Sequence, residues 1–307
     1  MRFLVLGGCG FIGSHVVDQL VLAGHDVRIV SRRPEAARGP VQGVEYVFGD
    51  CRDAGLLATS LDGIDGVLHM FSATTPGSGN LDPKNDVEQN LLSALTLLEE
   101  MCRAGVRRLV YLSSGGTVYG HPESIPIPES HPLRPIGSYG IVKVAVESYI
   151  GLYARERGLL PAIIRPSNTY GERQGRNGAH GVVSVLMRRA LAGSEFQVWG
   201  DGSLVRDYLY VGDLARLCRL AAESSLVGTF NAGSGHGTSL QTLIDHVMRI
   251  SGRSFPVNCG DARTVDVPVN VLDVALAADS LGWVPETPMQ EGLRLTWDWH
   301  RQYWPTE

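Results

Sequence analysis

A glycine-rich loop near the N-terminus constrains the fold of this chain more than any other feature. Residues 3–6 (FLVL) form a short apolar run, residues 7–13 (GGCGFIG) follow it, and residues 12–23 show helical periodicity. Glycines at this G-x-x-G-x-x-G spacing let the backbone approach a pyrophosphate, which then rests on the amides at a helix N-terminus. The segment therefore predicts a dinucleotide-binding unit. The loop residues expected to contact the cofactor are Gly7, Gly10, Phe11, Ile12 and Gly13.

Strand and helix patterns alternate through the first half of the 307 residues. Further strands are expected at residues 27–30, 46–48, 67–70, 109–112 and 162–164. The clearest helical patterns between them cover residues 87–104 and 139–157. Buried, β-branched strands that alternate with helices indicate a parallel sheet covered on both faces. We therefore predict an α/β fold with a Rossmann-type, doubly wound sheet.

The pattern changes after Arg165. Residues 171–180 are polar and rich in glycine, and regular alternation is lost. Helical patterns at residues 182–192, 240–250 and 271–281 are separated by short strands and loops. We expect a smaller, discontinuous α/β part over the carboxyl edge of the sheet. The predicted boundaries are residues 1–167 with about 204–235 for the dinucleotide-binding domain, and about 168–203 with 236–307 for the second domain.

Composition and termini argue against several classes of protein. A net charge of −5 leaves no basic excess with which to bind nucleic acid. The 5 cysteines are scattered without C-x-x-C spacing, so neither a disulfide framework nor a metal site is indicated. The chain begins directly on a strand pattern, and no apolar stretch approaches about 18 residues. We expect a cytoplasmic protein that does not bind membranes.

The end of the second predicted strand bears on the choice of cofactor. NAD-binding folds usually carry a carboxylate there, which holds the ribose hydroxyls. This chain has Ser31, Arg32 and Arg33 instead. Serine and guanidinium groups are suited to the 2′-phosphate of NADP, although solvated loop arginines are an alternative interpretation. Asp50, which follows the third strand and precedes Cys51, is placed either to accept from the adenine amino group or to cap the next helix.

Tyr139 and Lys143 stand four residues apart in a chain with only two lysines among its 27 basic residues. Residues at this spacing lie on one face of a helix. An ammonium beside a phenol favours the phenolate, so it lowers a pKa that starts near about 10. The pair predicts a tyrosine that exchanges protons near neutral pH. The alternative is an amphipathic helix with one snorkelling lysine.

Further motifs lie at residues 112–120 (LSSGGTVYG), 165–171 (RPSNTYG) and 199–213 (WGDGSLVRDYLYVGD). Together with residues 7–13 and the Tyr139/Lys143 pair, they resemble the extended short-chain dehydrogenase/reductase superfamily. The resemblance is to its nucleotide-sugar epimerase, dehydratase and reductase branch, and UDP-galactose 4-epimerase-like enzymes are the most similar. It runs from Arg2 to about Trp299, which is nearly the whole chain.

The resemblance implies roles for individual residues. Tyr139 would be the acid and base at a sugar hydroxyl, Lys143 would bridge the nicotinamide ribose, and Asn90 would steady the active-site helix. Met70 and Arg165 would complete the cofactor site, while Arg206 and Arg263 would clamp the nucleotide diphosphate. The residues expected to bind the substrate are Thr117, Asn168, His180, Gly181, Trp199, Arg206 and Arg263. A homodimer is implied as well, formed through the helices at residues 87–104 and 139–157.

One departure from the family pattern concerns the active-site hydroxyl. The family normally carries it two residues before the Thr117 position, where this chain has Gly115. Ser114 and Thr117 are the hydroxyls left to orient the reacting oxygen, and the sequence does not choose between them. The family's dehydratases have an acidic residue beside that hydroxyl, but this chain has Gly116 and Thr117 there. Dehydration is therefore not expected.

We predict a nucleotide-sugar 4-epimerase that works through a transient 4-keto sugar, with hydride passing to a bound nicotinamide and back. The alternative is a one-way, NADPH-dependent 4-ketoreductase of a nucleotide-linked keto sugar. Arg32 and Arg33 favour NADP, whereas the epimerase resemblance favours NAD, so NAD(P) stays open here. A non-catalytic NADP-sensing or scaffold protein is disfavoured by the intact Tyr139 and Lys143. Neither the sugar nor the nucleotide follows from the sequence, although a UDP-linked sugar is the expected substrate.

Overall fold

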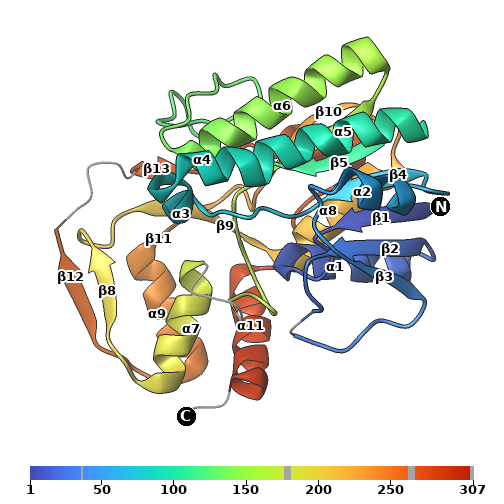
Figure 1. Ribbon diagram of the computed structural model, residues 1–307. Helices are drawn as coiled ribbons and strands as arrows, with labels where there is room; N and C mark the ends of the chain where they lie inside the picture. The colour runs from blue at the N-terminus through green and yellow to red at the C-terminus, as the bar shows by residue number, and fades with distance from the viewer. Residues whose placement is uncertain (36, 176–180, 262–266, 305–307) are drawn as a thin grey trace.

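The computed structural model describes residues 1–35, 37–175, 181–261 and 267–304. Its main sheet has seven parallel strands in the order β10-β6-β5-β4-β1-β2-β3 (Figure 1). The strands are β1 (Arg2–Leu6), β2 (Asp26–Ser31), β3 (Val44–Phe48), β4 (Gly66–His69), β5 (Arg108–Leu112), β6 (Leu160–Pro166) and β10 (Gly228–Ala232). Every predicted strand is confirmed, and the Rossmann-type doubly wound fold with them. The sheet gains β10 from a distant part of the chain.

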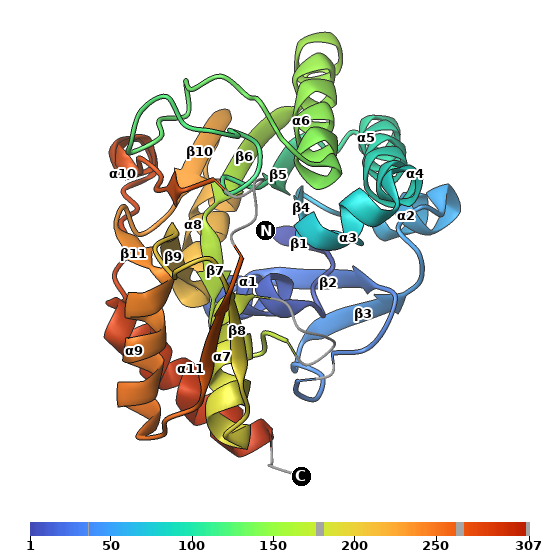
Figure 2. The ribbon, with the colours of Figure 1, turned by 90° about the vertical axis from the view of Figure 1, so that its left-hand side faces the viewer.

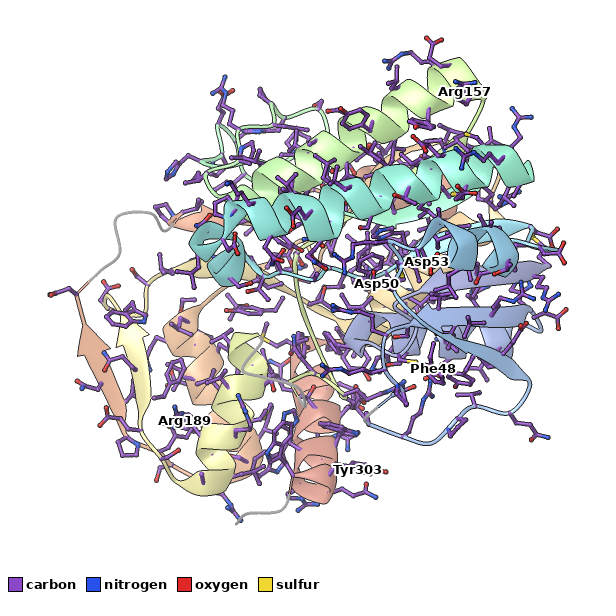
Figure 3. All side chains as sticks on the ribbon, viewed as in Figure 1. Phe48, Asp50, Asp53, Arg157, Arg189 and Tyr303 are labelled. Carbon is purple, nitrogen blue, oxygen red and sulfur yellow. The ribbon has the colours of Figure 1, made fainter. Side chains whose placement is uncertain are left out.

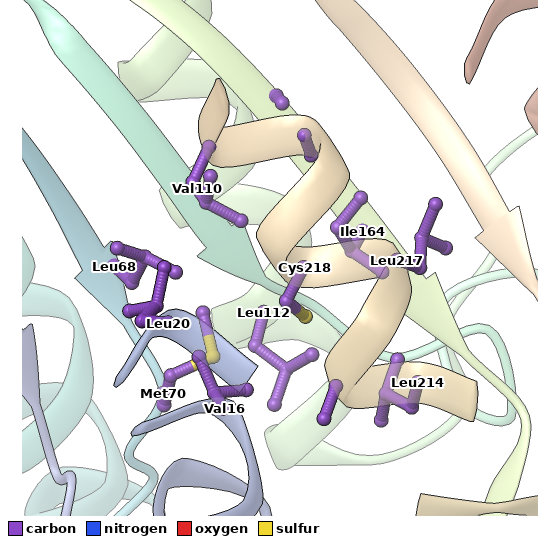
Figure 4. Close-up of a cluster of buried hydrophobic side chains, with 14 of the residues drawn as sticks. Val16, Leu20, Leu68, Met70, Val110, Leu112, Ile164, Leu214, Leu217 and Cys218 are labelled. Carbon is purple, nitrogen blue, oxygen red and sulfur yellow. The ribbon is translucent and has the colours of Figure 1, made fainter. Parts of the chain in front are cut away.

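Helices cover both faces of this sheet, because side chains on each strand alternate between two apolar layers. One layer packs against α1 (Phe11–Leu22) and α8 (Val211–Glu223). Figure 4 shows part of it, with Val16 and Leu20 beside Leu68 and Met70, and Leu217 beside Ile164.

The other layer packs against α2 (Ala54–Ser60), α5 (Ser93–Ala104) and α6 (Ser138–Arg157). Leu4 and Leu6 belong to this layer, whereas Phe3 and Val5 of the same strand belong to the first. The short apolar run that opens the sequence is therefore buried on both sides. This burial explains its lack of polar residues.

The predicted helix at residues 87–104 is present, but its first part is wound differently. After the short helices α3 (Pro76–Leu81) and α4 (Pro83–Asp86), residues Val87–Leu92 form a π-helical segment, η1, that runs into α5. Such segments often occur at functional sites, since the wider turn redirects a side chain. In this chain the buried polar residue of η1 is Asn90.

The second part of the chain packs beside the sheet around its own apolar cluster (Figures 1 and 2). β7 (Asn168–Tyr170), β11 (Gly237–Ser239) and β13 (Val269–Asn270) pair with β9 (Val205–Tyr210), and β8 (Phe196–Trp199) pairs with β12 (Val257–Gly260). The helices of this part are α7 (Val182–Ala192), α9 (Leu240–Ser251) and α11 (Met289–Tyr303). The predicted helices at 182–192 and 240–250 are confirmed, whereas α8 and α11 were not predicted.

The predicted helix at residues 271–281 is wrong in its first half. Only α10 (Ala275–Leu281) is helical. Leu272 instead forms a bridge with Ile127, and the Ile127 amide donates to the Val271 carbonyl over 2.8 Å. Leu272 and Ile127 are both fully buried with Val118 and Tyr119. Tertiary burial therefore overrides the local periodicity. The domain boundaries stay a prediction.

None of the helices in the described ranges is long and apolar enough to span a membrane.

Candidate active site

A cavity of about 780 Å³ opens at the carboxyl edge of the main sheet. Its walls come from segments that are far apart in sequence: the loop after β1, the ends of β2 and β4, the turn after β3, and α6. The predicted cofactor-binding residues in this lining are Gly7, Gly10, Phe11, Ile12, Ser31, Arg32, Asp50, Cys51, Met70, Tyr139 and Lys143. Two other predicted cofactor residues, Gly13 and Arg165, lie outside it.

The glycine loop forms a cradle that side chains would fill. Gly7 has φ +80°, and a Cβ there would lie 2.6 Å from the Cβ of Phe71. A Cβ on Gly13 would approach the Gly7 carbonyl oxygen to 2.2 Å, so Gly13 permits the loop to pack on α1 rather than lining the cavity. α1 begins after Gly10, which offers its first amides no side-chain cap. These amides fit the anionic diphosphate of a dinucleotide.

Asp50 and Asp53 both follow β3 (Figure 3), and the structure decides which of them caps the next helix. Asp53 is the N-cap of α2, and its carboxylate accepts from the amides of Gly55 and Leu56. The capping alternative for Asp50 is therefore wrong. Asp50 lines the cavity and accepts from Arg52 at 2.7 to 3.1 Å, which holds the pKa of Asp50 below its usual value.

Glu35 is a cavity residue that the sequence patterns missed. It lies in the loop after β2, near Ser31 and Arg32 in the cavity wall. Its carboxylate accepts from Arg38 Nε over 3.0 Å and lies 3.8 Å from Arg173 Nη1. Burial raises the pKa of Glu35, and the hydrogen bond from Arg38 opposes that rise. Glu35 belongs to no sequence motif, because residues in the loop between β2 and β3 follow no fixed spacing.

Tyr139 and Lys143 lie together on α6, as their spacing predicted, and both line the cavity. Lys143 Nζ is 5.6 Å from the centroid of the Tyr139 ring and 4.9 Å from that of Tyr111. It donates to the Leu112 carbonyl oxygen over 2.7 Å. Burial lowers the pKa of Lys143 to about 8, although Glu147 and Asp86 oppose that change.

The expected lowering of the Tyr139 pKa is not what the structure gives. Burial raises the pKa of Tyr139 to about 12, a hydrogen bond with Ser72 opposes the rise, and Asp86 adds to it. The loss of hydration outweighs the nearby ammonium, whose proton is directed at the Leu112 carbonyl rather than at the phenol.

Asn90 lies behind the cavity in a buried polar network. Its side-chain nitrogen donates to Asp86 Oδ1 and Thr74 Oγ1, each over 2.8 Å, and its oxygen accepts from the Ala73 amide over 2.8 Å. Asp86 is fully buried and accepts from the hydroxyl of Ser138, the residue before Tyr139, over 2.7 Å. The network joins η1, the loop after β4 and the start of α6. This geometry suits the steadying role predicted for Asn90.

Arg165 is directed into the protein rather than into the cavity. It is 5% exposed, donates to Glu147 over 2.6 Å, and its guanidinium lies 5.1 Å from the Tyr119 ring centroid. The prediction that Arg165 contacts the cofactor gains no support from this placement, because a buried ion pair already uses the side chain.

A second cavity of about 250 Å³ contains two of the predicted substrate residues, Asn168 and Gly181. Thr169 and Gln174 line both cavities, so the two adjoin. Trp199 on β8 is 45% exposed. Arg206 lies on β9 and donates to the Val205 carbonyl. Thr117 lies outside the linings of both cavities. The last two predicted substrate residues, His180 and Arg263, lie outside the described residues.

Arg173 is a further cavity residue that the sequence did not reveal. It has φ +66°, which is rare for a residue with a side chain. Its guanidinium donates to Asp18 over 2.6 Å and lies 3.2 Å from His15 Nδ1, both on α1. The loop after β7 is thereby held against the helix that follows the glycine loop.

The comparisons with known proteins agree with this geometry. A family model described as "NAD dependent epimerase/dehydratase family" matches residues 3–233. The UDP-glucose 4-epimerase of Mycolicibacterium smegmatis is 34% identical over 311 residues, which cover 98% of this chain and 99% of the relative. A putative UDP-glucose 4-epimerase of Methanocaldococcus jannaschii is 35% identical over 300 residues, covering 96% and 97%.

Two solved structures extend the similarity to three dimensions. A UDP-glucose 4-epimerase of Thermotoga maritima with UDP-glucose has a TM-score of 0.91 at 35% identity, covering 98% of this chain and 99% of that one. A UDP-glucose 4-epimerase of Thermus thermophilus in complex with NAD has a TM-score of 0.90 at 35% identity, with the same coverage.

Proposed function

The chain belongs to the NAD dependent epimerase/dehydratase family, and on that premise we propose that it interconverts a UDP-linked sugar with its C4 epimer. The resemblance drawn from the motifs is confirmed, and the epimerase is favoured over the one-way ketoreductase. The observation that carries the proposal is the meeting of the glycine cradle with Tyr139 and Lys143 in one cavity. A dinucleotide held by the cradle extends toward a phenol that can exchange a proton with a sugar hydroxyl.

In the proposed reaction, Tyr139 accepts the proton of the sugar 4-hydroxyl and later returns it to the opposite epimer. When bound, NAD supplies reversible oxidation at C4 of the sugar and a positive charge near the phenol. Lys143 stays within 5.6 Å of the Tyr139 ring, where its ammonium also favours the phenolate. Asn90 and Asp86 hold the start of α6, and therefore Tyr139, in place.

We propose NAD rather than NADP as the resident cofactor. Glu35 lies in the same part of the cavity wall as Ser31 and Arg32, and a carboxylate there suits ribose hydroxyls better than a 2′-phosphate. The similar Thermus thermophilus enzyme was solved with NAD. The alternative, that Arg32 binds the 2′-phosphate of NADP, is tested by Arg32→Ala. If the alternative holds, this variant should bind NADP more weakly and NAD as before. If it does not hold, Arg32→Ala should not weaken NADP binding selectively.

We propose that residues 168–203 and 236–307 bind the nucleotide sugar, as the predicted domain boundaries imply. Support comes from the cavity beside Asn168 and Gly181, which adjoins the larger one. The similar Thermotoga maritima enzyme was solved with UDP-glucose.

We also propose that a second copy of the chain covers the outer face of α6 and the neighbouring η1. Ile141, Tyr149 and Leu152 on α6 and Leu92 on η1 are 40–54% exposed, although all four are large and apolar. Figures 1 and 2 show α5 and α6 side by side on the outside of the molecule. Pairing with the same helices of another copy would remove this surface from water.

The test of the proposed function is conversion of UDP-glucose to UDP-galactose by purified protein without added cofactor. Denaturing the same sample should release NAD in about equimolar amount, because an epimerase regenerates its cofactor in every turnover. Consumption of external NADPH with a 4-keto sugar, without epimerisation, would show instead that the chain is a ketoreductase.

A further inference from the structure

The structure explains why a hydroxyl is absent at position 115. A Cβ on Gly115 would lie 2.6 Å from Leu272 Cδ1 and 2.9 Å from the Arg165 carbonyl oxygen. Both distances are shorter than any relaxed carbon contact allows. A side chain there would therefore meet the buried Leu272 and the Arg165 carbonyl oxygen. In this chain, position 115 can therefore carry a hydroxyl only if these neighbours shift.

The neighbouring hydroxyls are not equivalent. Ser113 is buried and donates to Glu147, which also pairs with Arg165. Thr117 Oγ1 is buried without a hydrogen-bond partner, and the residue lies outside the cavity lining. Ser114 lines the cavity together with Tyr139. A fourth hydroxyl, which no motif identifies, comes from a different strand.

Ser72 lies in the loop after β4 and lines the cavity with Tyr139. Its hydroxyl donates to the Thr74 carbonyl oxygen over 2.9 Å and lies 3.3 Å from Asn90 Oδ1. Ser72 also acts on the Tyr139 phenol, because it opposes the rise of the Tyr139 pKa that burial causes. The buried Asn90–Asp86 network also accepts from Ser138, so one network holds both the loop that carries Ser72 and the start of the helix that carries Tyr139.

We infer that Ser72 supplies the hydroxyl partner of Tyr139 that other members of the family place at the position of Gly115. This inference rests on the proposed function, since it concerns the proton that Tyr139 exchanges. A serine hydroxyl has one donor and two acceptor sites. It accepts from the neutral phenol while its own proton goes to Thr74, and it turns to donate to the phenolate. Ser72 is thus a positioning residue that serves both states of Tyr139.

Several ionisable groups also surround Tyr139, and their effects on the Tyr139 pKa are separate from the effect of the Ser72 hydroxyl. The groups are Lys143 on α6, Asp86 on α4, and Tyr111 on β5, with His69 on β4 and Glu147 on α6 acting on Lys143. All of them remain when Ser72 is changed. A shift in the pH dependence of Ser72→Ala would therefore report the lost hydrogen bond itself.

The first experiment compares Ser72→Ala, Ser72→Thr and the unmodified enzyme. Loss of the hydroxyl should lower kcat by about 10- to 100-fold with little change in KM. It should also move the acidic limb of the kcat–pH profile upward by about one unit, because the phenolate loses a donor. Ser72→Thr keeps the hydroxyl and should retain the original profile. Ser225→Ala, in the exposed loop between α8 and β10, is the matched control and should change nothing.

The second experiment measures ionisation without turnover. The ultraviolet absorbance of phenolate is titrated in the cofactor-loaded protein with and without Tyr139→Phe, and the difference isolates Tyr139. The same pair is then titrated with Ser72→Ala added, which should move the Tyr139 transition to higher pH. This readout needs no substrate. Absence of UDP-sugar turnover in the unmodified enzyme would count against the proposed function alone.

Unchanged kcat, pH profile and Tyr139 titration in Ser72→Ala would overturn the inference. So would a fall in kcat with no shift of either curve and no recovery in Ser72→Thr, because that pattern means that serine only fills space. If Ser114→Ala shifts the Tyr139 titration and Ser72→Ala does not, the hydroxyl partner is Ser114.

Discussion

Two opposing influences act on the proton of Tyr139. Burial removes water from the phenol and raises its pKa, whereas the hydrogen bond with Ser72 opposes that rise and a nearby cation favours the phenolate. Lys143 supplies such a cation 5.6 Å from the ring centroid, yet its own hydrogen bond goes to the Leu112 carbonyl. The catalytic value of the pair therefore depends on what the bound ligands add, and on hydroxyls in direct contact with the phenol.

Replacing Tyr139 by phenylalanine should lower turnover by about 10²- to 10⁴-fold, the usual contribution of a positioned acid or base. The ring keeps its packing, so the midpoint of thermal unfolding should change little. Tyr303→Phe is the control, because Tyr303 is exposed on α11 and far from the cavity (Figure 3). Steady-state kinetics measure the turnover of both variants. Near-normal turnover in Tyr139→Phe would show that this residue takes no part in the mechanism.

For individual residues, the sequence predicted which side chains lie together better than it predicted their pKa values. The i, i+4 spacing of Tyr139 and Lys143 correctly placed both in one cavity. It could not predict the direction of the Tyr139 pKa shift, since that depends on burial by segments distant in sequence. Glu35 and the hydrogen-bonding role of Ser72 went unnoticed because no local spacing distinguishes these residues from others in loops.

Among the secondary-structure elements, η1 leads to a specific expectation because its wide turn supplies Asn90 to the polar network. Asp86 precedes it and is fully buried. Its carboxylate accepts hydrogen bonds from Thr74, Asn90 and Ser138. Helix geometry alone would not bring these groups together, since they belong to separate segments.

Asp86→Ala should lower the free energy of unfolding by about 3 kcal/mol, because three buried donors lose their acceptor. It should also lower kcat, since Ser138 anchors the turn that carries Tyr139. Glu88→Gln is the control on the same segment, and its exposed side chain predicts a change within about 0.5 kcal/mol. Urea denaturation of both variants measures the difference, and equal effects would rule out the network as a stabilising element.

The elements that the sequence predicted well are those with strong local periodicity. α7 was predicted residue for residue, and the helix predicted at residues 240–250 matches α9 to within one residue. The segment at 271–274 was mispredicted because burial of Leu272 against Ile127 decides its conformation. The π-helical winding of η1 likewise has no sequence periodicity of its own.

For the whole molecule, three buried histidines predict a loss of stability in mild acid. Burial lowers the pKa of His15 and His69 to about 3 and that of His300 to about 4. In the unfolded chain each takes up a proton at about pH 6.5. Below that pH the unfolded chain binds more protons than the folded one, so the free energy of unfolding falls as pH falls.

Between about pH 7.5 and about pH 5.5 the three histidines together should reduce the free energy of unfolding by about 4 kcal/mol. Denaturant titrations at the two pH values measure the loss. His300→Gln should reduce the pH dependence by about a third, whereas His121→Asn, at an exposed loop position, should leave it unchanged. A free energy of unfolding that is flat over this range would contradict the burial argument.

Assembly gives a second expectation at this scale. Ile141→Glu combined with Leu152→Glu should convert the proposed dimer to a monomer, because two carboxylates would be buried at the centre of the helix face. Leu22→Glu is the control, since Leu22 is 81% exposed at the end of α1 on another side of the molecule. Sedimentation velocity reports the mass directly. A monomer before any substitution would refute the dimer.

The overall architecture followed from the sequence because the strand–loop–helix alternation restricts how a parallel sheet can be covered. All predicted strands are present, and the order β3-β2-β1-β4-β5-β6 is that of a dinucleotide-binding fold. The addition of β10 to the edge, and the contacts that bring Arg173 to α1, depend on long-range packing. Neither has a signature within a short stretch of sequence.

The filling of the space beside Gly115 by Leu272 also restricts how this active site can change by mutation. A single substitution of glycine by serine would meet Leu272 and the Arg165 carbonyl, and shrinking Leu272 would relieve only one of these contacts. The family's usual hydroxyl is thus separated from this sequence by intermediates that pack badly. Selection from a library randomised at position 115 alone should return glycine, whereas position 72 should accept serine or threonine. The fitness effect of either site depends on residues far away in the sequence.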